Sequence, residues 1–115
     1  MLFRSRFQHV IDFGDVTHYF IVPYRCTLRN VTGIVQDDPG DADTVTFTEN
    51  SAGTALGVLL FGSTIAAGAV GTWTADTTDG AHVLAAGEKI KIVTSAAATV
   101  QCDLDIELDP YARTT

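Results

Sequence analysis

The sequence predicts a single all-β domain, folded as an antiparallel, jelly-roll-like sandwich of about eight strands. Short runs of alternating apolar and polar residues recur along the chain, and the clearest is residues 100–108. Clusters of Gly, Pro, Asp and Asn separate these runs at the spacing expected of a sandwich, and no run has the period of an amphipathic helix. With 115 residues, the chain is long enough for one core.

The strands follow one another with short turns between them. Residues 1–8 are expected to form an extended N-terminal arm, and residues 9–115 a single β-sandwich domain. Pro23 ends pairing after the second strand because proline has no amide N–H, and Pro39-Gly40 lies in the clearest loop, residues 37–43. The eight expected strands are residues 9–13, 16–22, 25–36, 44–48, 54–61, 69–75, 89–94 and 100–108.

The third of these strands has a mixed pattern. Cys26, Leu28 and Ile34 are expected to face the core. Val31 and Val35 have the opposite parity, which indicates a bulge or burial on both faces.

A membrane helix is an alternative for residues 51–75, which carry no charge. Five glycines, several threonines and the lack of flanking Lys or Arg favour two strands joined by a turn. The sequence therefore predicts no membrane partner.

The chain is acidic, with a formal net charge of −7. This charge disfavours binding to the phosphate backbone, so nucleic acid is not an expected partner. Residues 1–29 carry four arginines and two aspartates, whereas the remainder carries three basic and twelve acidic residues. This asymmetry suggests a basic end that meets an acidic surface, with chance placement as the alternative.

Cys26 and Cys102 are expected to be free, buried thiols rather than a disulfide. The N-terminal run MLFRSRFQ has neither the apolar region nor the cleavage site of a signal peptide, which indicates synthesis in a reducing cytoplasm.

No set of residues predicts catalysis or a cofactor. The aspartates of residues 37–43 could bind calcium, but they lack the order of an EF-hand loop, and a solvated turn is the alternative. The histidines His9, His18 and His82 have no ligand spacing, and Ser51 and Ser63 lack a nucleophile motif. Asp103, Asp105 and Glu107 form a row on one strand face, where they are expected to solvate the protein.

Four aromatic residues have two possible roles. Tyr19, Tyr24, Trp73 and Tyr111 could form a platform for a sugar. Anchoring in the core or at an interface is favoured, and Tyr19, Tyr24 and Trp73 are expected at an oligomer interface.

Two stretches carry a resemblance to a known group of proteins: YFIVPYRCTL at residues 19–28 and LAAGEKIKI at residues 84–92. With the acidic Pro-Gly loop and residues 44–47 between them, the chain resembles the small β-sandwich proteins of tailed-bacteriophage virions, over residues 16–108. A stand-alone domain of this length, without a coiled coil or fibre repeat, looks most like a head decoration or cement protein.

That resemblance implies a non-enzymatic structural protein on the outer surface of the capsid, made in the host cytoplasm, which ties neighbouring major capsid subunits together. It also implies homo-oligomers, and a trimer is favoured over a dimer. The arm is expected to contact the capsid through Leu2, Phe3, Arg4, Arg6 and Phe7. The alternative is a fibre or head-spike module that recognises a host receptor or glycan, and an enzyme is a distant third possibility.

Overall fold

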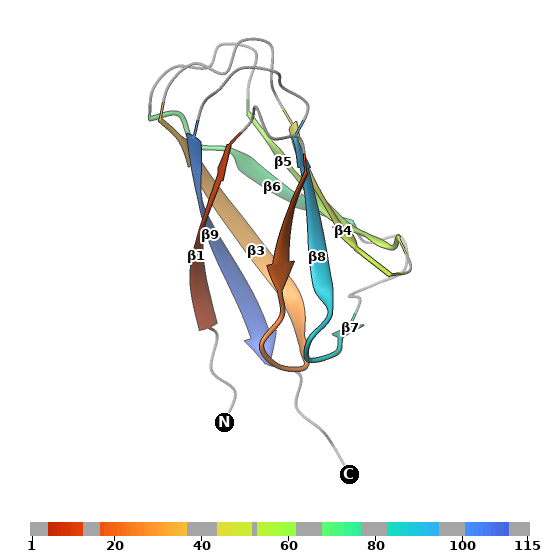
Figure 1. Ribbon diagram of the computed structural model, residues 1–115. Helices are drawn as coiled ribbons and strands as arrows, with labels where there is room; N and C mark the ends of the chain where they lie inside the picture. The colour runs from red at the N-terminus through yellow and green to blue at the C-terminus, as the bar shows by residue number, and fades with distance from the viewer. Residues whose placement is uncertain are drawn as a thin grey trace.

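The computed structural model describes residues 5–12, 17–36, 44–51, 53–61, 68–76, 83–94 and 101–110. In these ranges the protein is all-β, with nine strands, no helix and two antiparallel sheets (Figure 1). No helix of the described part is therefore long and apolar enough to cross a membrane. The strands are β1 (Ser5–Asp12), β2 (Thr17–Ile21), β3 (Cys26–Val35), β4 (Thr44–Glu49), β5 (Ala55–Leu60), β6 (Thr72–Ala75), β7 (Val83–Leu84), β8 (Lys89–Thr94) and β9 (Gln101–Pro110).

The strands pair as one long hairpin that has been rolled up. β1 pairs with β9, β2 with β8, β3 with β7, and β4 with β5. Sheet A has the order β1-β9-β3-β7, and sheet B has the order β2-β8-β4-β5-β6. This nested pairing in two sheets is that of a jelly roll, and β6 adds a strand at one edge, so the predicted fold class is confirmed.

The observed strands differ from the prediction most clearly at β1 and β7. β1 begins at Ser5 rather than at residue 9, because Ser5 pairs with Leu108, and residues 5–8 of the expected arm are part of sheet A. The short strand β7, which was not predicted, accounts for the ninth strand in the described ranges.

The irregular pattern of β3 comes from a bulge between Leu28 and Asn30. The bulge turns Arg29 and Asn30 both outward and reverses the parity of the residues after them. Val31 and Val35 are therefore buried, as the bulge alternative required. The prediction that Ile34 faces the core was wrong, because Ile34 lies after the bulge and is exposed.

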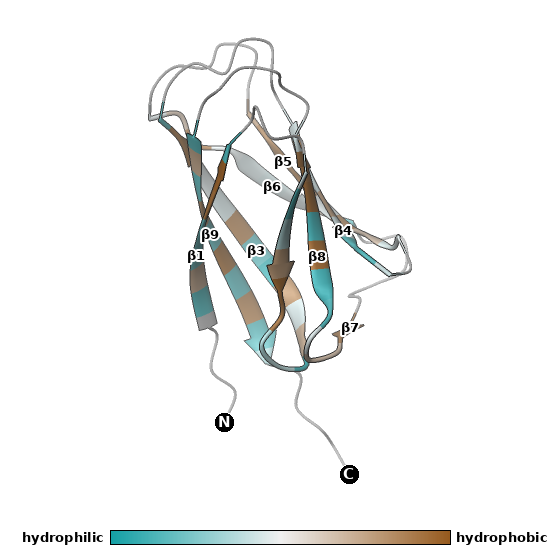
Figure 2. Cartoon of the chain, viewed as in Figure 1, coloured by the Kyte–Doolittle hydropathy of each residue, from teal (hydrophilic) through white to brown (hydrophobic). Residues whose placement is uncertain are grey.

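The core lies between the two sheets and consists mainly of inward-facing residues from alternate strand positions. In β9 this alternation appears as successive brown and teal bands (Figure 2). Cys26 and Cys102 are buried and free, as predicted. In the ladder between β3 and β9, Cys26 lies opposite Pro110 at one end and Cys102 lies opposite Val35 at the other, so the two thiols are far apart. Burial raises the pKa of the Cys26 thiol to about 11 and that of Cys102 to about 12, so both stay protonated at neutral pH. The fully buried residues are headed by Phe47, Ile11, Leu59, Leu84, Ile90, Ile92, Leu104, Ile106 and Leu108.

One long side of the sandwich is closed by backbone. Residues 68–71, which lead into β6, hydrogen-bond to the end of β3: Gly71 N donates to Gly33 O at 2.9 Å, and Val35 N donates to Ala69 O at 3.1 Å. A Cβ on Gly33 would lie 2.6 Å from a Leu59 side-chain carbon, and one on Gly71 would lie 2.8 Å from another. Both glycines therefore allow the two segments to close over Leu59.

The opposite long side lies between β1 and β2, which are the edge strands of their sheets. Aromatic side chains fill it: the Phe7 ring centroid is 5.7 Å from that of Phe20 and 6.4 Å from that of Tyr24. His9 meets Phe20 edge to face at 5.8 Å. Side chains rather than main-chain bonds thus close this side.

Candidate interaction surfaces

The outer face of sheet A is dominated by carboxylates. The register places alternate residues of β9 on this face, beside Arg6, Gln8 and Val10 of β1 and beside Asn30, Thr32 and Ile34 of β3. The carboxylates are Asp12, Asp103, Asp105, Glu107 and Asp109. The sequence correctly predicted that the acidic row of β9 faces away from the core, but the expectation that all three of its carboxylates are solvated was wrong for Glu107, which is 9% exposed as a whole residue.

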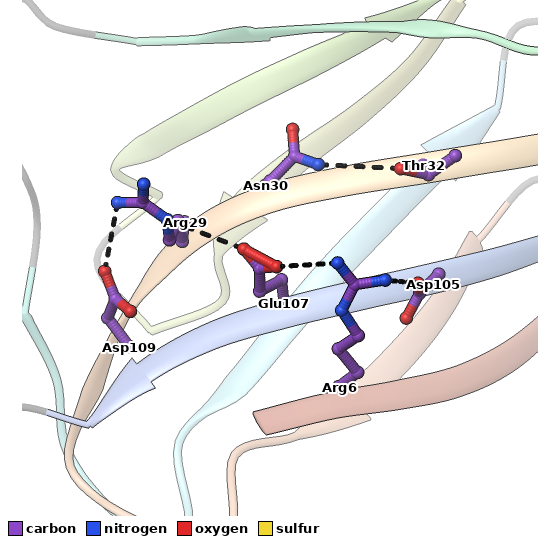
Figure 3. A network of polar contacts seen from close by, with 7 residues as sticks. All are labelled: Arg6, Arg29, Asn30, Thr32, Asp105, Glu107 and Asp109. Carbon is purple, nitrogen blue, oxygen red and sulfur yellow. Dashed lines mark hydrogen bonds and ion pairs between the residues drawn. The ribbon is translucent and has the colours of Figure 1, made fainter. Parts of the chain in front are cut away.

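At one end of this face, two arginines are clamped between three carboxylates (Figure 3). Arg6 Nη1 lies 3.1 Å from Asp105 Oδ2, and its Nη2 lies 3.3 Å from Glu107 Oε1. Arg29, which the bulge turns outward, lies 3.5 Å from Glu107 Oε2 and 3.3 Å from Asp109 Oδ2. Glu107 is the centre of the network, with a side chain only 12% exposed. The network joins β1, β9 and β3 across their strands.

Farther along the same face, apolar side chains flank a carboxylate. Asp103 pairs with Val10 on one side and with Ile34 on the other, and Ile34 forms a bridge with Val70. A groove of about 460 Å³ runs here, lined by Gln8, Val10, Thr32, Ile34, Asp103 and Asp105, among others. Asp103 Oδ2 accepts a hydrogen bond from the Gln36 amide at 2.7 Å.

The outer face of sheet B has a different chemistry. Rows of threonine and small apolar residues cross its strands, as in the row Thr17, Val93, Thr46, Val58 and Thr74. The outward positions of the five described strands contain no carboxylate. Their charged residues are Lys89 and Lys91, which pair with Ile21 and Tyr19 of β2.

Large apolar side chains are exposed on both outer faces. Their exposed fractions lie between 41% and 61%. On sheet A they are Val10, Ile34 and the adjoining Val70, and on sheet B they are Tyr19, Ile21 and Leu60.

The residues expected to contact a capsid do not all lie on one exposed surface. Leu2, Phe3 and Arg4 lie outside the described residues. Arg6 is outward and tied to Asp105 and Glu107, whereas Phe7 is inward, half-buried and packed against Phe20 and Tyr24. Phe7 thus contributes to the core rather than to an exposed surface.

The three aromatic residues expected at an oligomer interface do not come together. Tyr19 and Trp73 lie on β2 and β6, at opposite edges of sheet B. Trp73 points inward, meets Phe47 edge to face at 5.3 Å and occupies the space beside Gly57, where a Cβ would be 2.4 Å from the indole ring. Tyr24 also packs on the core, and only Tyr19 of the three is largely exposed. Tyr111 lies outside the described residues, so the described aromatic residues form no sugar platform.

The described residues hold no metal-binding cluster. Among the described residues, no three His, Cys, Asp or Glu side chains lie close enough together to hold a metal ion. Residues 37–43 and His82 lie outside the described part. His18 Nε2 lies 3.0 Å from the Asp12 carbonyl oxygen, which links β2 to β1, and His9 packs on Phe20. Both histidines therefore have structural contacts.

Sequence reasoning missed Val10, Ile21 and Val70 as surface residues. The signal for the first two was present: the runs Val10-Ile11 and 19–22 are apolar at consecutive positions, so one residue of each adjacent pair must face outward in a strand. Val70 had no such signal, since its exposure depends on the contact of residues 68–71 with β3.

Searches with protein-family models, curated proteins and solved structures found no match to this chain.

Proposed function

We propose that this protein is a structural component of a tailed-bacteriophage virion, which binds the outside of the capsid and ties neighbouring major capsid subunits together. It acts as a homo-oligomer, with a trimer favoured over a dimer. It has no catalytic role and needs no cofactor.

The observation that carries the proposal is the presence of exposed apolar side chains on both outer faces. Val10, Ile34 and Val70 lie at sheet A, and Tyr19 and Ile21 lie on sheet B. Contiguous exposed apolar side chains rimmed by polar residues mark sites of protein association. Ile34 adjoins Val70, and Tyr19 and Ile21 share one face of β2. A protein that joins neighbours needs at least two separate contact surfaces, and the exposed apolar side chains on two faces of this sandwich support the proposal for that reason.

The two stretches that carry the resemblance to virion proteins are partners in space. Val22 N donates to Glu88 O at 2.9 Å, and Gly87 N donates to Val22 O at 2.8 Å. β2 pairs with β8 and β3 pairs with β7 around this contact. The resemblance thus rests on one corner of the sandwich rather than on two unrelated turns.

Binding to an assembled shell would add to the stability of that shell by mass action. Copies linked on a lattice also gain effective concentration, so contacts that are individually weak suffice. The capsid contacts are proposed to include Leu2, Phe3 and Arg4, with Arg6 beside them at the start of β1.

The test is co-sedimentation of the purified protein with capsid shells of the encoding phage, before and after shell expansion. Saturable binding to expanded shells is expected. Well-folded protein that binds neither shell would overturn the role, and a glycan-binding assay would then test the receptor-binding alternative.

The contribution of the arm is tested by deleting residues 1–4 rather than 1–8. Residues 5–8 pair with residues 105–108 of β9, so the longer deletion would also damage the sheet. The shorter deletion is expected to abolish shell binding without changing the thermal unfolding midpoint. Unchanged binding would remove Leu2, Phe3 and Arg4 from the proposed contact.

A further inference from the structure

The edge of sheet B carries a patch in which two lysines flank two exposed apolar residues. Ile21 pairs with Lys89 and Tyr19 pairs with Lys91, so all four side chains project from the same face. Within the described residues neither lysine forms an ion pair. β2 is the edge strand of its sheet, so the described strands leave one flank of this basic patch open.

The groove on sheet A has the complementary composition. Asp103 of β9 lies between Val10 of β1 and Ile34 of β3, and Asp105 lies between Gln8 and Thr32. The groove that they line measures about 460 Å³. Asp103 accepts one hydrogen bond from Gln36, and Asp105 is paired with Arg6. We call this the acidic groove.

We infer that copies of this chain bind one another head to tail, with the basic patch of one copy docked in the acidic groove of the next. Lys89 and Lys91 are two residues apart on a strand, as are Asp103 and Asp105. Each pair is therefore spaced by about 6.8 Å, which lets two lysines meet two aspartates together. Tyr19 and Ile21 both lie on the β2 side of the lysines, so they then pack along one flank of the two aspartates, against Val10 and Gln8 of β1 or against Ile34 and Thr32 of β3.

The charges also disfavour pairing either surface with its own copy. Pairing two acidic grooves would set aspartates against aspartates, and pairing two basic patches would set lysines against lysines. Juxtaposed like charges are strongly unfavourable at an interface. A contact between two different surfaces repeats from copy to copy, and it closes into a ring or continues as a chain according to the rotation between copies.

The cost of desolvation favours the same surface on sheet B. Around the basic patch the face carries threonine hydroxyls such as Thr17 and Thr48, rather than carboxylates. Hydroxyl groups cost much less to remove from water than charges do. Self-association concerns the free protein, so it stands whether or not the capsid role is correct.

The test uses two charge-reversal variants, measured by sedimentation velocity. One variant reverses the patch (Lys89→Glu with Lys91→Glu), and the other reverses the groove (Asp103→Lys). The wild type is expected to form oligomers, and each variant alone is expected to weaken association by about a hundredfold. Mixed together, they should form a 1:1 complex, because the intact patch of the groove variant fits the intact groove of the patch variant.

Matched controls alter charge on the same faces outside the contact. Gln101→Lys adds a positive charge to β9 near its start, and Thr72→Glu adds a negative charge to β6, at the far edge of sheet B. Both controls should associate as the wild type does. A monomeric wild type would overturn the inference. Full self-association of either reversal variant would also overturn it, since it would indicate a symmetric contact through the surface left intact.

Discussion

The two long sides of the sandwich are closed by different means. Between β3 and the segment before β6, main-chain hydrogen bonds and two close-packed glycines, Gly33 and Gly71, join the sheets. Between β1 and β2, the sheets meet through Phe7, His9 and Phe20. The first side is fixed by backbone, and the second depends on side chains.

The backbone-closed side contributes to the stability of the fold, whereas the side-chain-closed side leaves strand edges that other chains could bind. The backbone-closed side uses up the hydrogen-bonding groups of the strand end that it covers. The side-chain-closed side leaves two edge strands, β1 and β2, and an edge strand offers unpaired N–H and C=O groups to other chains. The basic patch lies on β2 and β8, and Val10 of the acidic groove lies on β1. The basic patch therefore borders the side-chain-closed side, and the acidic groove reaches it through Val10.

The largest effect is expected from the backbone-closed side. Phe47 is fully buried and meets Trp73 of β6 edge to face. Phe47→Ala removes this contact and leaves a cavity, which should lower the free energy of unfolding by about 3–5 kcal/mol. Urea unfolding measures it, with Val58→Ala, an outward-facing and half-buried position on neighbouring β5, as the control. A loss below about 1 kcal/mol would contradict the packing described.

A smaller effect is expected from the side-chain-closed side. Phe20 is half-buried between Phe7 and His9, so Phe20→Ala should cost about 2 kcal/mol. Its loss should also speed amide hydrogen exchange in β1 and β2 while β3 stays protected, because only the edge strands lose their contact. Equal acceleration in all three strands would show that the two sides do not open separately.

The sequence could predict features that depend on neighbouring residues, but not those that depend on contacts between distant strands. The strands follow from local alternation, as in β9, and the bulge in β3 left a local trace in the parity of Val31 and Val35. Which aromatic residues are covered depends instead on how distant strands meet. Tyrosine and tryptophan are common at interfaces, but Tyr24 packs against Phe7 of β1, and Trp73 packs against Phe47 of β4.

The proposed contact surfaces were only partly predictable, for the same reason. Tyr19 was expected at an interface and is exposed, and Lys89 and Lys91 alternate with apolar residues in the sequence. That they stand beside Tyr19 and Ile21 follows from the pairing of β2 with β8, in which Ile21 meets Lys89 and Tyr19 meets Lys91 across a long stretch of sequence. Arg29 could be assigned to the network around Glu107 only once the bulge was located.

A third prediction concerns how β1 is held on the weaker side. Glu107 forms ion pairs with Arg6 of β1 and Arg29 of β3, so Glu107→Ala leaves each arginine with one carboxylate partner fewer. The loss should be about 1–2 kcal/mol, more than for one exposed pair, because the Glu107 side chain is nearly buried. Gln8→Ala, one row away on β1, is the control for thermal unfolding. A loss no larger than that of the control would show that the network adds nothing to the sheet.

The smallest effect is a pH dependence on the same side. Burial, and then the charge of nearby His18, lower the pKa of His9 below its usual 6.5. As the pH falls through 6.5, the unfolded chain therefore takes up a proton at this position more readily than the folded protein does. The free energy of unfolding should decrease with acidification from about pH 6.5 down to the lowered pKa, and this contribution should be fully present at higher pH. His9→Gln should reduce the slope between pH 5 and 7 in urea unfolding, whereas Gln8→Ala should preserve it. An unchanged slope in His9→Gln would mean that the seam between β1 and β2 admits water to the imidazole, and that the aromatic residues close this side less completely than the ring contacts indicate.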